Sequence, residues 1–322
     1  MAYVSLIIVL LVVAAAAGAV VLGMMALHLL KPPRMTDGRA MYILKRLDPS
    51  DLGLRFEPVD FQVRDEADGG TIRIAAWWIA ADVAAARTVL ILHGYSDAKV
   101  GGIAWAPVWH SLGWNVLAID LRAHGESGGK YSTGGFFERD DVEHVIDQLR
   151  LARPQATRDL AIFGVSLGAT IAAAIATRRD DLLAVILESP YSDFRIAIAA
   201  HGRRLAMPLE LAYGLAMRLA QRMSGARYDQ VRPVELIGQI RCPVLMIHSG
   251  RDTFVSAAEI DALAAVLAGR KQPGLSRHVI IAEAEHTLGL HVDPVAYREM
   301  IRSFISEIGD PPMPPAAESA LS

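Results

Sequence analysis

The chain has 322 residues, of which 52% are hydrophobic and 21% are charged, and its formal net charge is -3. This charge gives no reason to expect a polyanionic partner, and no basic stripe with interleaved aromatic residues is present, so a nucleic-acid ligand is not expected. The single cysteine, Cys242, excludes an intrachain disulfide and a thiolate metal cluster, and its place before Pro243 in an apolar run predicts a small buried residue.

The chain begins with a long apolar segment, and residues 2–30 contain no charged side chain. About 20 apolar residues suffice to span a bilayer, so we expect residues 1–30 to form a transmembrane anchor. The alternative is a cleavable signal peptide, which the alanine-rich residues 14–19 would suit, but residues 1–5 lack the usual basic start. His28, near the end of the span, is expected at the membrane interface rather than in a site within the membrane.

The basic residues that follow the apolar segment indicate its orientation. Positive charge collects on the cytoplasmic side of a membrane, so we expect a single-pass membrane protein with its large domain in the cytoplasm. The residues concerned are Lys31, Arg34, Arg39, Lys45 and Arg46.

Residues 31–58 are expected to form a juxtamembrane linker, because Pro32-Pro33 ends the apolar helix, with a short helical piece at 40–47. Two alternating runs then predict antiparallel strands on either side of the turn Asp68-Gly69-Gly70. Short, continuously apolar strands follow. The predicted strands are 59–63, 71–79, 88–92, 115–119, 160–163, 183–187, 244–248 and 278–282.

Strands this apolar are typical of a parallel sheet whose two faces are covered by helices. Their alternation with helical stretches predicts a doubly wound α/β domain over residues 59–308. The alternation of strands and helices is interrupted at about 190–240. There, a Met- and Leu-rich amphipathic segment at 205–223 is interpreted as a helical cap over the sheet's carboxyl edge. The proline-rich tail, 309–322, is predicted to be disordered. The covering helices are predicted at 102–112, 137–151, 166–178, 257–267 and 294–308.

A candidate nucleophile lies in Gly164-Val165-Ser166-Leu167-Gly168, between a predicted strand and a predicted helix. This is the G-x-S-x-G pattern in the strand–turn–helix context that gives it meaning. The turn is so tight that side chains at the flanking positions would collide, which explains the glycines. It lifts the hydroxyl of Ser166 out of the sheet at a helix N-terminus. The alternative is a glycine-rich turn without chemistry.

Two further side chains follow later strands in the order that such a nucleophile requires, first an acid and then a histidine. Asp252 follows the strand at 244–248, and His286 follows the strand at 278–282. The imidazole takes the serine proton during attack and returns it to the leaving group, while the carboxylate fixes the imidazole tautomer. We therefore predict Ser166 as nucleophile, His286 as general base and Asp252 as the orienting acid.

Other residues compete for these roles. His291 lies farther from the strand end than His286, and Glu283 and Glu285 share the loop of the histidine, which makes them less suited to face it across the site. His93 and the turn at 120–127, which contains a histidine between charged residues, are both expected to be structural.

An oxyanion hole needs two donors aimed at the developing negative charge, one after the nucleophile and one from the loop after the strand at 88–92. The candidates are the backbone N–H groups of Leu167 and Tyr95, and the position of the Tyr95 hydroxyl is left open. The sequence has no His/Asp/Glu spacing typical of a metal site and no G-x-G-x-x-G after the first parallel strand. Neither a metal nor a nicotinamide or flavin cofactor is therefore expected.

The motifs together resemble the α/β-hydrolase superfamily, in particular its serine aminopeptidase-like, monoacylglycerol-lipase-like and acyl-protein-thioesterase-like branch. The resemblance covers roughly residues 59–308, whereas the N-terminal span is not part of the common domain. Ala123 stands where many relatives carry glycine. The resemblance rests on His93-Gly94, residues 120–127, Gly164-Val165-Ser166-Leu167-Gly168, Ser189-Pro190-Tyr191, residues 243–252 and His286.

The resemblance implies a serine hydrolase that cleaves a carboxylic ester or thioester through an acyl-enzyme. The apolar cap and the nearby bilayer favour a small acyl or lipid-like substrate, and the alternative is that the apolar cap helices simply pack on the core. A serine peptidase is the first alternative, although the cap offers no acidic cluster to bind a substrate amino terminus. A non-catalytic binding protein is the second, and the intact set of Ser166, Asp252 and His286 argues against it.

Overall fold

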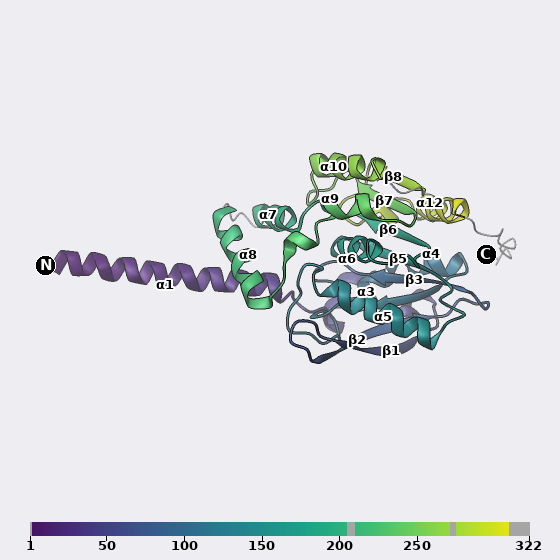
Figure 1. The fold of residues 1–322 in the computed structure, drawn as a ribbon, viewed down its shortest axis with the longest axis horizontal. Helices are drawn as coiled ribbons and strands as arrows, with labels where there is room; N and C mark the ends of the chain where they lie inside the picture. The colour runs from purple at the N-terminus through teal and green to yellow at the C-terminus, as the bar shows by residue number, and fades with distance from the viewer. Residues whose placement is uncertain (1, 205–209, 271–274, 309–322) are drawn as a thin grey trace.

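The computed structural model describes residues 2–204, 210–270 and 275–308, and its centre is one eight-stranded sheet (Figure 1). The strand order is β1-β2-β4-β3-β5-β6-β7-β8, in which β2 is antiparallel to both β1 and β4 and all later pairs are parallel. The α/β-hydrolase fold class and the predicted strands are thereby confirmed. The strands are β1 Glu57–Arg64, β2 Thr71–Ile79, β3 Arg87–Leu92, β4 Asn115–Ile119, β5 Asp159–Val165, β6 Ala184–Glu188, β7 Val244–Ser249 and β8 Ser276–Ile281.

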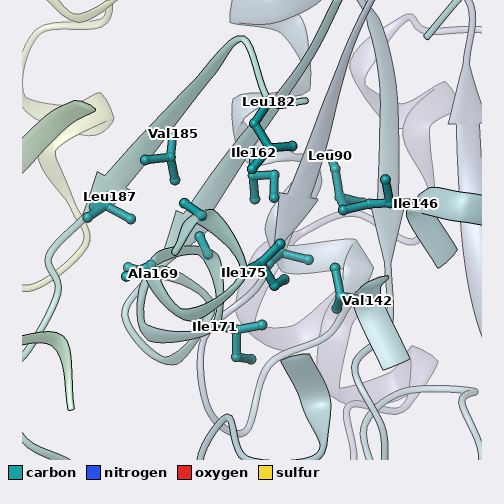
Figure 2. Close-up of a cluster of buried hydrophobic side chains, with 14 of the residues drawn as sticks. Leu90, Val142, Ile146, Ile162, Ala169, Ile171, Ile175, Leu182, Val185 and Leu187 are labelled. Carbon is teal, nitrogen blue, oxygen red and sulfur yellow. The ribbon is translucent and has the colours of Figure 1, made fainter. Parts of the chain in front are cut away.

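Helices cover both faces of the sheet because the central strands are apolar on both sides. In β5, Leu160 and Ile162 join the core on one face, while Ala161 and Phe163 join the core on the other. The first face is covered by α5 Glu138–Ala152, α6 Leu167–Ala176 and α10 Ala257–Ala268, and the second by α4 Ala106–Ser111 and α12 Pro294–Glu307. Figure 2 shows the first layer, with Leu90 and Ile162 from the strands, Val142 and Ile146 from α5, and Ile171 and Ile175 from α6.

One predicted helix, at 102–112, is divided in the structure. The segment runs as α3 Lys99–Gly102, a 3-10 turn at Ile103–Trp105, and then α4, which has Pro107 in its first turn. A proline has no backbone N–H and cannot continue the hydrogen bonding of a preceding helix, so the chain restarts there.

The N-terminal helix, α1, spans Ala2–Leu30 and is long and apolar enough to cross a membrane. It projects from the rest of the molecule, and its C-terminal part lies beside α8 (Figure 1). The short helix α2, Asp37–Leu44, follows and packs Ala40 against Ala98 and Val100. The segment at 31–58 is thus held on the surface of the domain.

The cap consists mainly of α7 Phe194–Arg204 and α8 Glu210–Ser224. The expected amphipathic segment at 205–223 begins outside the described residues and continues as α8. The expected tail at 309–322 also lies outside them. Two further short α-helices are α9 at Pro233–Leu236 and α11 at Gly289–Val292, and 3-10 turns lie at Pro49–Leu52, Tyr228–Gln230 and Ile237–Gln239.

Candidate active site

Ser166 lies on the turn from β5 to α6 with φ 52 and ψ -108, a conformation that costs a non-glycine residue about 1–3 kcal/mol. The flanking glycines are required by contact with the backbone. A Cβ on Gly164 would lie 2.2 Å from the Gly168 carbonyl oxygen, and a Cβ on Gly168 would lie 2.1 Å from the Leu92 carbonyl oxygen. The Ser166 N–H donates to the Glu188 carbonyl at 2.8 Å, which holds the turn against β6.

The structure brings Ser166, Asp252 and His286 together. The His286 ring atom Nε2 lies 3.1 Å from Ser166 Oγ, and Nδ1 lies 2.6 Å from Asp252 Oδ2. With Nδ1 protonated, the ring donates to the carboxylate and accepts the serine hydroxyl proton. A hydroxyl, an imidazole and a carboxylate from three different strand ends therefore form one chain of hydrogen bonds.

Asp252 is held in its ionised form. Burial alone would raise the pKa of this carboxyl, but the hydrogen bond and charge of His286 and two backbone donors outweigh burial and lower it. The donors are the N–H groups of Phe254 at 2.7 Å and Val255 at 2.9 Å, both directed at Oδ1. Oδ2 remains free to face the imidazole.

The competing residues lie elsewhere. His291 is exposed on α11, and Glu285 is exposed on the loop before it. Glu283 pairs with Arg251. Within the described chain, the hydrogen bonds of the His286 ring go to Ser166 and Asp252.

The loop that carries His286 is held in place by a hydrogen bond from the next residue, Thr287. Thr287, with φ 61, donates its N–H to Ser189 Oγ at 3.2 Å, and Ser189 itself has φ 49. The Phe254 ring lies beside the imidazole, with 5.0 Å between the ring centroids. These contacts limit the freedom of the imidazole before any substrate binds.

Tyr95 and Leu167 line the same cavity as Ser166. Leu167 is the first residue of α6, where the N–H has no acceptor within the helix. Among the residues that the structure describes, neither backbone N–H finds an acceptor. Two free donors beside the hydroxyl of Ser166 match the requirement for binding an oxyanion.

His93 supports the Tyr95 loop from below. Its Nε2 accepts the N–H of Leu121 at 3.0 Å, and its Nδ1 donates to the Gly94 carbonyl at 2.7 Å. Burial, followed by the charge of His124, holds the pKa of His93 well below its usual range. A neutral ring whose two nitrogens both hydrogen-bond to the backbone has a structural role and stabilises the loop.

The turn after β4 is held by hydrogen bonds within it and by one from α3. Lys99 Nζ donates to Asp120 at 2.7 Å, and Ser127 Oγ donates to the Asp120 carbonyl at 2.7 Å. His124 is fully buried, with Nδ1 donating to the Arg122 carbonyl at 2.8 Å. Ala123 has φ 59, which is the left-handed region that favours glycine.

Ser166 and His286 open into a cavity of about 910 Å³ whose walls are mostly apolar. One wall comes from the cap, through Tyr191, Phe194, Ala197, Ile198 and Tyr213. A second wall, which was not predicted from the sequence, comes from α1. Its residues are Val21, Met24, Met25, His28 and Leu29. The signal available in the sequence was their spacing, which places all five on one stripe of a helix.

A second depression, of about 930 Å³, lies over α5 and the end of α6 and contains none of the predicted site residues. Its arginines are paired with its carboxylates, Arg178 with Asp140 and Glu143, and Arg179 with Asp147 and Asp181. It is a solvated charged face. The described residues include no group of three His, Cys, Asp or Glu side chains able to hold a metal ion. Cys242 is buried, and burial raises the pKa of its thiol to about 11.

The chain is similar to several known proteins. Residues 84–233 match the family model described as serine aminopeptidase, S33. The uncharacterised protein YqkD of Bacillus subtilis is 28% identical over 230 residues, which are 70% of this chain and 72% of that protein. The lysophosphatidylserine lipase ABHD12 of Danio rerio is 27% identical over 191 residues, 56% of this chain and 47% of the lipase, so the match spans about half of the lipase.

Solved structures share the architecture. An esterase of Pyrococcus furiosus superposes with a TM-score of 0.69 at 24% identity, covering 87% of this chain and 98% of the esterase. The acylaminoacyl peptidase of Pyrococcus horikoshii gives a TM-score of 0.56 at 18% identity, covering 84% of this chain and 43% of the peptidase. At this identity the likeness speaks for the fold alone. Together with the match to the serine aminopeptidase family model over residues 84–233, it supports an enzyme of the α/β-hydrolase fold that is similar to serine hydrolases.

Proposed function

We propose that the protein hydrolyses a carboxylic ester or thioester of an acyl substrate through an acyl-enzyme formed on Ser166. One observation carries the proposal: the chain of hydrogen bonds from Asp252 through His286 to Ser166, at 2.6 and 3.1 Å, ends at a hydroxyl that faces an apolar cavity. Neither a metal nor an organic cofactor is needed for this chemistry.

The steps follow from the positions of the groups. His286 Nε2 accepts the hydroxyl proton as Ser166 Oγ attacks the acyl carbon, and Asp252 stabilises the imidazolium that results. The carbonyl oxygen becomes negative and binds the N–H groups of Tyr95 and Leu167. The imidazolium then protonates the departing alcohol or thiol, and water, deprotonated by the same ring, releases the acid from Ser166.

The cavity supports an acyl substrate. Aromatic and aliphatic side chains of the cap and of α1 form two of its walls, and such walls bind hydrocarbon better than a charged metabolite. The names of the similar proteins point in the same direction, since one is a lipase that acts on a lysophospholipid and another is an esterase.

We infer that residues 1–30 remain in the mature protein as a single-pass anchor and are not cleaved as a signal. Ala26 and Leu30 are fully buried against the domain, so cleavage would uncover apolar surface on α8 and open the cavity. In this assignment residues 31–58 connect the anchor to the hydrolase domain at 59–308 on the cytoplasmic side. The intact mass of the purified protein tests retention, and C-terminal fusions to alkaline phosphatase and to a green fluorescent protein test the side.

A peptidase is the second candidate, and the observation in its favour is that Asp97 lines the cavity. A carboxylate there would bind a substrate amino terminus. Burial raises the pKa of Asp97 to about 6, and Arg46 and Arg39 offset its charge. A buried carboxyl group that is already opposed by arginines is a poor partner for an ammonium group, so the ester or thioester is favoured.

A fluorophosphonate probe and a panel of nitrophenyl esters from acetate to palmitate test the proposal, with aminoacyl nitroanilides as the peptidase arm. The wild-type protein should react with the probe and cleave esters faster than anilides. Ser166→Ala should do neither while retaining its melting temperature, and His286→Ala should lose turnover by thousands-fold or more. A wild-type protein that fails to label and cleaves nothing is a binding protein, and faster cleavage of anilides makes it a peptidase.

A further inference from the structure

The helix α1 divides into a free part and a docked part. Residues 3–21 are exposed along their whole length, and burial begins at Leu22. Farther along, Ala26 and Leu30 are fully buried beside Ala220 of α8. At about 1.5 Å per residue the free part is about 28 Å long, close to the hydrocarbon thickness of a bilayer of about 30 Å. A bilayer spanned by the free part would therefore have its surface near the point where the helix meets the domain.

The docked part is fastened on the side of the catalytic loops. The Tyr95 hydroxyl donates to the His28 carbonyl at 2.7 Å, and the Ser132 N–H donates to the Leu30 carbonyl at 2.8 Å. Just beyond the helix, Arg34 Nη1 donates to the carbonyls of Gly125 at 2.6 Å and Ser127 at 2.8 Å. The helix end is thus fixed to the Tyr95 loop, which lines the cavity of Ser166, and to the segment at 125–132.

Two stripes of the docked part have different partners. Ala26 and Leu30 pack on the cap, whereas Val21, Met24, Met25, His28 and Leu29 face the cavity that contains Ser166. The second set follows the i, i+3, i+4, i+7, i+8 spacing of one helix face. From Leu29 to Val21 this face runs for about 12 Å along the helix, away from the nucleophile loops and toward the free part.

We propose that α1 is a specificity-determining wall of the active site, along which the acyl chain of a bilayer-resident ester or thioester lies while its carbonyl is held at Ser166. The inference rests on the proposed function and adds to it the substrate class and the route. The acyl chain follows Leu29, Met25 and Val21 outward, and at Val21 it reaches the hydrocarbon region of the membrane. The substrate thus passes from bilayer to site along one helix without its chain crossing water.

Several features agree with this direction of entry. The two methionines, Met24 and Met25, adapt their shape to an apolar partner more readily than branched side chains do. The cap also exposes Leu211 and Leu215 on α8, the helix that packs against α1. These side chains extend the apolar surface beside the end of the free segment, where lipid would cover them.

The first test uses the full chain in phosphatidylcholine nanodiscs. Met25→Trp should shorten the acyl site, so that the ratio of kcat/KM for decanoate over acetate nitrophenyl ester falls at least tenfold. Leu27→Trp is the matched control, because Leu27 lies on the same helical turn, is 39% exposed and does not line the cavity. Its ratio should equal that of the wild type. An unchanged ratio in Met25→Trp, with ester turnover present, would contradict the assignment of α1 as a wall of the acyl site. It would leave the proposed function unaffected.

The second test locates the acyl chain directly and distinguishes a failure of this inference from a failure of the proposed function. A decyl fluorophosphonate carrying a diazirine at the far end of its chain is allowed to react with the full-length protein, and the adduct is irradiated and mapped by mass spectrometry. Crosslinks at residues 21–29 are expected. Crosslinks confined to other walls of the cavity overturn the inference. Absence of any Ser166 adduct overturns the proposed function itself.

Discussion

The phenolic oxygen of Tyr95 donates a 2.7 Å hydrogen bond to the backbone carbonyl of His28. The last carbonyls of a helix have no partner within it, so a donor from outside stabilises the end of α1. Because the N–H of the same tyrosine is a proposed oxyanion donor, one residue links the apolar helix to the reacting carbonyl.

Replacing Tyr95 by Phe removes this link and keeps the backbone donor. We expect a loss of about 1 kcal/mol in unfolding free energy, because the His28 carbonyl loses its partner. We also expect a several-fold fall in kcat/KM, since the loop is less restrained. Urea denaturation in detergent and ester kinetics measure the two effects. Tyr42→Phe serves as the control, because Tyr42 is 79% exposed, and equal behaviour of the two variants would contradict the link.

The Asp252→Asn variant tests the orienting acid. An amide favours the wrong imidazole tautomer, so turnover should fall by as much as ~10⁴ while KM changes little. Glu283→Gln is the matched control, since Glu283 is an exposed carboxylate paired with Arg251. A large loss in Glu283→Gln with normal activity in Asp252→Asn would show that the acid has been misassigned.

Gly168 should tolerate no side chain. A Cβ there would lie 2.1 Å from the Leu92 carbonyl oxygen, and backbone on both sides has little room to move. We expect Gly168→Ala to lose about 3 kcal/mol or more of unfolding free energy. Gly94→Ala provides the comparison, because its Cβ would meet Ser166 Cβ at an ordinary 3.6 Å. Similar melting temperatures for the two variants would refute the steric account of the turn.

Glu188 makes stability depend on pH. Burial, aided by the charge of Asp252, raises its pKa to about 7 from the usual 4.5, although Tyr297 donates a 2.7 Å hydrogen bond to it. The folded state therefore favours the protonated carboxyl. This contribution is complete below about pH 4.5 and is lost as the pH rises through about 7.

Glu188→Gln should remove that dependence, because a neutral amide still accepts the Tyr297 hydrogen bond. Relative to the variant, the wild-type protein should lose about 3 kcal/mol of unfolding free energy between pH 4.5 and pH 8. Chemical denaturation at several pH values measures the difference. Parallel curves for the two proteins would mean that Glu188 is ionised in the folded state at all of these pH values.

Much of the fold follows from the sequence because its signals are local. Strands such as Val244–Ser249 are apolar on both faces and end in turn residues, and the glycines around Ser166 mark a turn that admits no side chain. The order of Ser166, Asp252 and His286 along the chain indicated that they would meet, and the structure places them within hydrogen-bonding distance of one another.

The contribution of α1 to the cavity could not be predicted in the same way. In an apolar span, Met24 and Met25 suit lipid and protein equally well, so their composition does not reveal which of the two they contact. The partner of the Tyr95 hydroxyl is a backbone carbonyl, which leaves no mark on the identity of His28. The break at Pro107 was visible in the sequence, but proline is also tolerated in the first turn of a helix.

The burial of Cys242 makes the chain unusually convenient for spectroscopy. Because the thiolate is the reactive form, a thiol with its pKa near 11 hardly reacts with maleimides at neutral pH. A cysteine placed at Val21 or at another exposed position of α1 would then be the one that takes a fluorophore in the native enzyme. The emission of a polarity-sensitive dye, moved one residue at a time, would report whether each turn of the helix enters the lipid and how deeply.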